Sequence, residues 1–188
     1  IRNVIIFTTS LYKSKKMPFE HILPYIWECS PVPFKPKQKK TKFKRMFGVL
    51  PEKIINKPVV GFCGQAKNKE RTDLIKIFKH SNKVKTNYLL RKKFWGGKPN
   101  NKQIVNDFNS NIKRSHFTIC SRGAGNFSMR FYQTLAFGRI PVLIDSDMEF
   151  PFENEIEWDD LIVRGSNAQE VLNKLLLFWN NNDIIKVQ

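Results

Sequence analysis

The feature that most constrains the fold is a regular alternation of short apolar runs and amphipathic segments from Pro58 onward. Short apolar runs bounded by turn residues are typical of buried strands, and apolar residues spaced three and four apart are typical of helices. Strand and helix signals that alternate with short connections indicate a parallel sheet covered by helices. The sequence therefore predicts an α/β fold.

The same pattern predicts where the elements lie. Strands are expected at residues 4–8, 59–63, 84–90, 116–120 and 142–144, with a further apolar piece at 161–163, and helices at 70–79, 104–112 and 128–137. Gly138 stands where a residue with positive φ normally ends a helix. Ser166 to Gln169 has the spacing of a capping box, which predicts that a last helix begins there.

The first 57 residues differ from the rest of the chain, because they are irregular and rich in Pro and Lys. The chain has 188 residues, which is enough for one ordinary domain. We therefore expect an N-terminal segment or linker at 1–57 and a ligand-binding domain at 58–188. Within the first part, seven basic residues fall between Lys35 and Arg45 without apolar periodicity, which is typical of an exposed linker or loop.

The overall charge is +17, from 33 basic and 16 acidic residues, and it has two interpretations. Clustered Lys and Arg bind nucleic acid or other phosphate-rich ligands. Alternatively, Lys is a common solvated surface residue throughout this chain, and this compositional interpretation is favoured. The hydrophobic content of 41% and the 16 Phe exclude a disordered basic tail, because such tails lack core-forming side chains.

The cysteines and histidines predict neither a disulfide framework nor a metal site. Cys29, Cys63 and Cys120 form no close pair, and the last two each end an apolar run, where a free thiol acts as a small buried hydrophobe. The three histidines are scattered. No apolar run approaches the ~20 residues that span a bilayer, so we expect the chain as given to be soluble. A start at Ile1 rather than Met suggests a trimmed fragment.

The stretch from Cys120 to Asp145 carries the clearest functional signal. It reads as strand, glycine-rich turn, helix, glycine stop and strand. Ligands of open parallel sheets bind beyond the carboxyl ends of the strands, so the turn is expected in a ligand crevice. Glycines allow backbone N–H groups to approach an anion closely, and the following helix directs its positive dipole end at the same point. With the forked donors of Arg122 and Arg130, the turn predicts a diphosphate pocket.

Three colinear segments resemble the donor-binding half of the exostosin family of glycosyltransferases. They are Arg-Ser-His-Phe-Thr-Ile-Cys-Ser-Arg-Gly (114–123), Asn-Phe-Ser-Met-Arg-Phe-Tyr (126–132) and Leu-Ala-Phe-Gly-Arg-Ile-Pro-Val-Leu-Ile-Asp (135–145). The resemblance covers about residues 58–165. It implies a GT-B fold, in which a Rossmann-like sheet with helices on both faces holds the nucleotide-sugar. It also implies inverting transfer from a UDP-sugar to a glycan acceptor, with no cofactor and usually no bound metal.

The resemblance implies roles for individual residues. The UDP-sugar is expected to contact Arg71, Arg122, Gly123, Gly125, Asn126, Ser128, Arg130 and Gln133. Gln133 stands where the family usually has Glu, so it keeps a carbonyl acceptor for the ribose hydroxyls but loses the charge. Ser121 stands where the family tends to have Pro. Asp145, Asp147 and Glu149 follow a strand end, where they either bind sugar hydroxyls or cap the loop.

The sequence leaves the catalytic base and the type of sugar open. Inverting transfer needs a base to accept the proton of the acceptor hydroxyl. In a GT-B enzyme that base commonly comes from the other half, which another chain or a missing N-terminal half would supply here. Xylose, galactose, glucuronic acid and N-acetylglucosamine all fit as donor sugars. The localisation also stays open: we expect the cytoplasm if the chain is complete, and the Golgi lumen or a membrane tether if it is a fragment of a longer eukaryotic enzyme.

Two other functions remain open from the sequence. The first is a basic nucleic-acid-binding module built on the Lys35–Arg45 block, although we expect no nucleic-acid partner. The second is a subunit that binds a nucleotide-sugar without catalysing transfer.

Overall fold

The computed structural model describes residues 5–24, 57–93, 101–123 and 125–182. Its centre is a five-stranded sheet with the order β4-β3-β5-β6-β7, in which all neighbours are parallel. The strands are β3 (Val59–Gly64), β4 (Lys85–Leu90), β5 (Phe117–Ile119), β6 (Ile140–Ile144) and β7 (Val163–Gly165). The predicted α/β fold with a parallel sheet is therefore confirmed.

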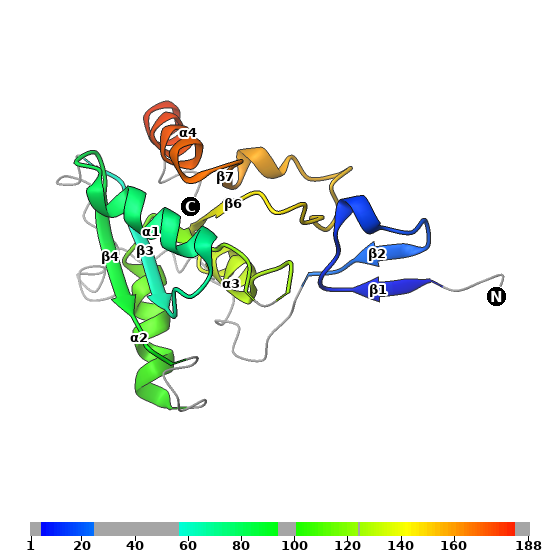
Figure 1. Cartoon of the computed structure of the whole chain (residues 1–188), viewed down its shortest axis with the longest axis horizontal. Coiled ribbons are helices and arrows are strands. Elements are labelled where there is room, and N and C mark those ends of the chain that lie inside the picture. The colour runs from blue at the N-terminus through cyan, green and yellow to red at the C-terminus, as the bar shows by residue number, and fades with distance from the viewer. Residues whose placement is uncertain (1–4, 25–56, 94–100, 124, 183–188) are drawn as a thin grey trace, which may run out of the picture.

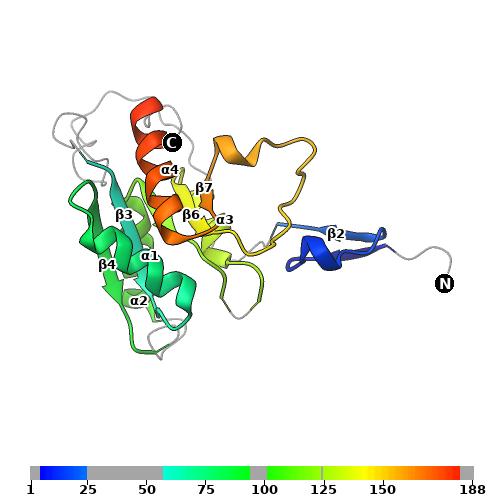
Figure 2. The ribbon, with the colours of Figure 1, turned by 45° about the horizontal axis from the view of Figure 1, so that its top comes forward.

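Four helices cover the two faces of this sheet (Figures 1 and 2). They are α1 (Lys69–His80), α2 (Lys102–Lys113), α3 (Met129–Ala136) and α4 (Ala168–Asn181). Helices α1 and α4 pack together on one face, whereas α2 packs against β3 and β4, and α3 against β6, on the other. The arrangement is that of a Rossmann-like domain.

Two apolar clusters form the core on the two faces. The larger one joins the strands to α1 and α4, and its fully buried members include Phe62, Phe78 and Phe117. The smaller one surrounds Phe131 of α3, whose ring lies 5.5 Å from that of Phe150. Cys63 and Cys120 are buried free thiols, as predicted, and Cys29 lies outside the described residues.

The ends of two helices test the sequence signals for helix termini. Gly138 follows α3 with a φ of 62°, which confirms the predicted helix stop. The capping box was predicted one residue too early, because α4 is capped by Asn167 rather than Ser166. The Asn167 side chain accepts from the Glu170 N–H at 3.0 Å, and the Glu170 carboxylate accepts from the Ser166 N–H at 2.8 Å. Glu170 decides the position because its charge complements the helix dipole.

The described residues before the sheet, 5–24, form an N-terminal arm that projects from the α/β body, as Figure 1 shows. The arm contains two short parallel strands, β1 (Ile6–Thr8) and β2 (Glu20–Ile22), joined through a 3-10 helix at Lys13–Lys15. The sequence predicts the first strand only. The basic block at 35–45 lies outside the described residues, and the division of the chain at residue 57 stays a prediction.

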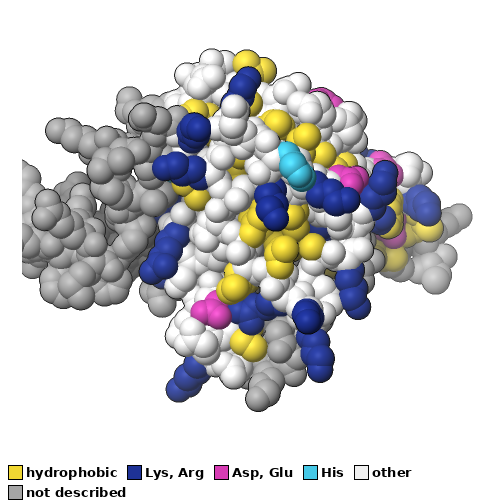
Figure 3. Space-filling view, turned by 60° about the vertical axis from the view of Figure 1, so that its left-hand side comes forward, with side chains coloured by type: hydrophobic (Ala, Val, Ile, Leu, Met, Phe, Trp, Pro, Cys, Tyr) yellow, Lys and Arg dark blue, Asp and Glu magenta, His cyan; other side chains and the backbone are white. Residues whose placement is uncertain are grey.

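Figure 3 shows how the described basic side chains are distributed on one face of the molecule. In the space-filling view they are dispersed across the visible face and do not form one patch (Figure 3). This dispersal agrees with the compositional interpretation of the charge. Among the described residues, no helix is long and apolar enough to cross a membrane, and no three His, Cys, Asp or Glu side chains are arranged to hold a metal ion.

Candidate functional site

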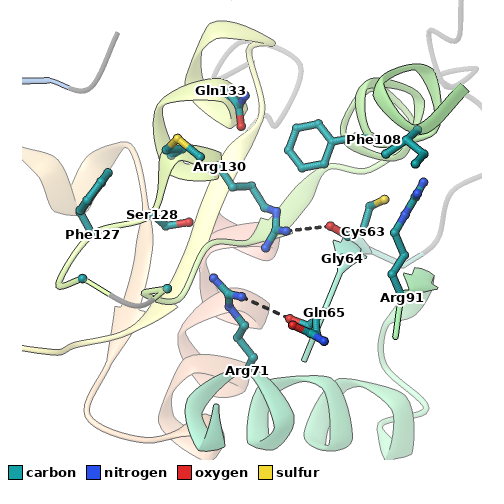
Figure 4. A pocket seen from close by; sticks show the side chains of 14 residues that line it. Cys63, Gly64, Gln65, Arg71, Arg91, Phe108, Phe127, Ser128, Arg130 and Gln133 are labelled. Atoms are coloured by element: carbon teal, nitrogen blue, oxygen red, sulfur yellow. Dashed lines mark hydrogen bonds between the residues drawn. The ribbon is translucent and has the colours of Figure 1, made fainter. Parts of the chain in front are cut away.

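A cavity of about 310 Å³ opens at the carboxyl ends of β3 and β5. These two strands flank the point where the strand order reverses, since the chain leaves β3 toward β4 and leaves β5 toward β6. In open parallel sheets this switch point is the usual ligand site. The lining comes from the end of β3, from α1, α2 and α3, and from the glycine-rich loop after β5 (Figure 4).

Six of the eight residues predicted to contact a UDP-sugar line this one cavity. They are Arg71, Gly123, Gly125, Ser128, Arg130 and Gln133. Residues from α1, the glycine-rich loop and α3, which are up to 62 positions apart in sequence, are thus brought together. Their contact with a ligand stays a prediction.

Arg130 reaches from α3 into the middle of the cavity and joins the ends of two strands. Its guanidinium donates to the Cys63 carbonyl of β3 at 2.7 Å and to the Ile119 carbonyl of β5 at 3.3 Å. The Phe62 ring lies 4.5 Å from the guanidinium carbon and the Phe108 ring 5.5 Å away. Burial lowers the pKa of Arg130 to about 10. The group nevertheless stays a cation at neutral pH.

Arg71 joins the same two strand ends from the opposite face of the sheet. From α1, its guanidinium donates to the Gln65 carbonyl after β3 at 3.2 Å and to the Ser121 carbonyl after β5 at 3.2 Å. Burial lowers its pKa as well. Figure 4 shows the two guanidinium groups converging on the space between Ser128 and Gln65.

The cavity lining is strongly cationic. Arg71, Arg91 and Arg130 belong to it, and none of its described lining residues is Asp, Glu or His. Arg91 forms an ion pair with Asp107 at 3.0 Å, whereas no described carboxylate pairs with Arg71 or Arg130. The Nε of Arg130 is buried and has no partner in the described structure. Two partly buried cations whose described hydrogen bonds go to backbone carbonyls favour an anionic ligand.

Gly64 makes room for Arg130. Its φ is +144°, and a Cβ built there would lie 2.8 Å from a terminal guanidinium nitrogen of Arg130. This position was not predicted as a site residue, and neither were Gln65, Arg91 and Phe108. A signal was present for two of them, because Gly64 directly follows the strand predicted at 59–63, where a ligand is expected, and Phe108 lies in the helix predicted at 104–112.

The other two predicted contacts, Arg122 and Asn126, are not part of the lining. The Arg122 side chain forms an ion pair with Glu70 at 3.0 Å. Asn126 is only 1% exposed, and its side-chain amide donates to the Leu11 carbonyl at 3.4 Å.

The three acids predicted near the sugar face the N-terminal arm or β7. Asp147 accepts hydrogen bonds from the backbone N–H and the hydroxyl of Ser14, which lower its pKa. Glu149 pairs with Lys16 at 2.5 Å, and Asp145 lies 3.8 Å from Arg164 of β7. These contacts agree with a role as loop caps, the second of the two roles that the sequence left open, and contact with a sugar stays a prediction.

Comparisons with known proteins show which family the chain resembles. The model of the Exostosin GT47 domain matches residues 4–176, and so reaches beyond the 58–165 where the sequence resemblance was expected. A probable glucuronosyltransferase of Oryza sativa subsp. japonica is 29% identical over 93 residues, which are 50% of this chain and 18% of that protein.

Two relatives from Arabidopsis thaliana are similar over shorter stretches. The probable glucuronoxylan glucuronosyltransferase IRX7 is 31% identical over 74 residues, 39% of this chain and 14% of its own length. The probable beta-1,4-xylosyltransferase IRX10L is 36% identical over 50 residues, 27% of this chain and 12% of its own length. The matched stretches thus span less than a fifth of these relatives. With a family model matching most of its length, and a cationic cavity at the switch point of its sheet, this chain belongs to the exostosin GT47 family of glycosyltransferases.

Proposed function

We propose that the chain binds a UDP-sugar in the cavity between β3 and β5 and takes part in inverting transfer of the sugar to a hydroxyl of a glycan acceptor. The observation that carries the proposal is the pair of partly buried arginines, Arg71 and Arg130. Both line the cavity, and neither has a carboxylate partner among the described residues. A diphosphate supplies the negative charge that this arrangement lacks.

The same pair suits the chemistry of the leaving group. As the bond from the sugar to the UDP oxygen breaks, negative charge grows on the diphosphate. Guanidinium groups already held in place stabilise that charge, and the loss of one such donor raises a barrier by about 2.7–4 kcal/mol. Since these residues carry positive charge into the cavity, we expect UDP binding to persist in the presence of a metal chelator.

The remaining lining suggests where the rest of the donor lies. Phe108 and Ile104 of α2 give the cavity an apolar wall suited to the face of a base. Gln133 presents an amide from α3 that can accept from ribose hydroxyls. Glucuronic acid and xylose are the first sugars to test, because the names of the relatives refer to them.

A nucleotide-sugar-binding subunit without transferase activity is the second candidate. The observation in its favour is that, among the residues that the structure describes, no Asp, Glu or His that could act as a base lines the cavity. In the transferase, the base comes from another chain or from a further part of a longer protein. Release or transfer of the sugar from a panel of UDP-sugars, measured with and without glycan acceptors, distinguishes the two candidates.

Calorimetric titration with UDP tests the proposed site. One charge-assisted hydrogen bond contributes about 1.5–3 kcal/mol, so Arg71→Met and Arg130→Met should each weaken binding by roughly 10- to 150-fold. Arg122→Met is the matched control, because Arg122 pairs with Glu70 outside the lining. The affinity of this variant for UDP should stay within about threefold of the wild-type value.

Thermal unfolding of each variant shows whether it is folded. If a methionine variant unfolds, Arg71→Lys and Arg130→Lys provide milder changes. Lysine keeps the positive charge but loses the planar guanidinium and its paired N–H donors. Absence of UDP binding by the wild type, or equal affinity in all folded variants, contradicts the proposal.

A further inference from the structure

The N-terminal arm contacts the glycine-rich loop from behind the cavity. The hydroxyl of Ser10 accepts from the backbone N–H of Asn126 at 3.1 Å. A Cβ added to Gly125 would lie 3.3 Å from that hydroxyl oxygen. Ser10 therefore lies next to Gly125, a residue that lines the proposed ligand site.

Asn126 is the junction between three distant segments. Its side-chain amide donates to the Leu11 carbonyl of the arm at 3.4 Å, and its side-chain oxygen accepts from the Ser146 hydroxyl after β6 at 2.8 Å. The side chain is buried, so these bonds are protected from competition with water. One buried amide thus joins the arm, the glycine-rich loop and the end of β6.

A row of polar contacts holds the arm so that Ser10 reaches the loop. Lys13 pairs with Glu153 at 2.8 Å, and Lys16 pairs with Glu149 at 2.5 Å. Next to these ion pairs in the sequence, Tyr12 forms an antiparallel bridge with Met148. Leu11 is buried, so the arm also inserts one apolar side chain at this point.

We propose that Ser10 and Asn126 form a latch, through which the docked arm holds the glycine-rich loop in the shape that binds the donor. Both are positioning residues, since neither belongs to the cavity lining. The latch rests on the proposed function, because its effect is exerted on the donor site. Linkage then requires reciprocity: if the docked arm raises the affinity for the donor, the donor must stabilise the docked arm by the same factor.

Two measurements on Ser10→Ala test the latch. The variant leaves the Asn126 N–H without its partner while keeping every cavity residue. Calorimetric titration with UDP should show affinity lowered by at least about fivefold, the lower end of typical coupling between sites. Hydrogen exchange of residues 8–16 should slow when UDP is added to the wild type, and should respond much less in the variant.

Two further variants complete the design. Ser10→Thr keeps the hydroxyl and should restore affinity. Ser81→Ala is the matched control. The Ser81 hydroxyl accepts from the Lys83 N–H just before β4, at the end of the sheet opposite the cavity. The affinity of this variant for UDP should equal that of the wild type.

The outcomes separate this inference from the proposed function. If the wild type does not bind UDP, both the proposed function and the latch are wrong. If the wild type binds UDP and Ser10→Ala binds it equally well, the latch alone is wrong. Lowered affinity without any effect of UDP on exchange in the arm also overturns the latch, because reciprocity then fails.

Discussion

The α/β body and the N-terminal arm are held in place by different forces. The body buries a continuous apolar core on both faces of its sheet. The arm leaves much of its apolar surface exposed, with Phe7 61% accessible, and contacts the body mainly through hydrogen bonds and ion pairs. Apolar burial contributes a large stabilising free energy that salt does not screen. Ion pairs at a surface contribute little, and salt screens them. The cavity at the switch point belongs to the body, but its glycine-rich loop is contacted by the more weakly held arm.

Matched substitutions of two phenylalanines should give the largest contrast. Phe131→Ala removes a ring from the core under α3, where it is 1% exposed, and should lower the free energy of unfolding by about 3–5 kcal/mol. Phe7→Ala, in the exposed strand of the arm, should change it by less than about 0.5 kcal/mol. Urea titration followed by tryptophan fluorescence measures both. Similar losses from the two variants would show that the arm is part of the same cooperative core.

Mild acid should destabilise the body before it affects the arm. The Nδ1 of His116 accepts from the Val59 N–H at 3.0 Å, and burial lowers the pKa of this histidine from 6.5 to about 4. The neutral ring therefore stabilises the fold above pH 6.5, and this contribution is lost as the pH falls toward 4, at up to about 1.4 kcal/mol per unit.

Unfolding free energies measured across this range check the assignment. His116→Asn keeps an acceptor that does not titrate, so it should flatten the dependence. In the arm, the hydrogen bonds from Ser14 hold the pKa of Asp147 below its usual value, so that contact should survive to lower pH. A profile for His116→Asn identical to that of the wild type would contradict the role of the ring.

Charge reversal should show that the arm is held electrostatically. Lys16→Glu and Glu149→Lys each place like charges together and should speed hydrogen exchange in residues 8–16, while the double variant restores the attraction and the slow exchange. The effect is the smallest of the three, on the order of 1 kcal/mol, and should shrink as salt is added. Independent, additive effects of the two changes would mean that the pair does not couple the arm to the body.

The sequence predicts the body well because its signals are local. Strands β3 and β6 are apolar runs, and the glycine-rich loop follows directly from β5, the third strand of the body, so the cavity and six of its residues could be expected. The cap of α4 was misplaced by one residue because Ser166 and Asn167 are both good N-caps.

The roles of Asn126 and of the acids after β6 could not be read from the sequence in the same way. Their partners, Ser10, Leu11, Ser14 and Lys16, lie more than a hundred residues earlier in the chain. No local periodicity encodes such contacts. A polar residue beside a ligand loop therefore looks like a ligand contact until the fold shows what it touches.

The join between β3 and β5 consists of two register pairs, Val60 with Phe117 and Gly61 with Thr118, and beyond them the gap is bridged by the side chains of Arg71 and Arg130. The carboxyl ends of these two strands are therefore held together partly by guanidinium groups, whereas the larger apolar cluster and the packing of α1 against α4 reach across the join and close the rest of the body. Loss of both arginine side chains should let the carboxyl ends of β3 and β5 move apart while the shared core stays closed.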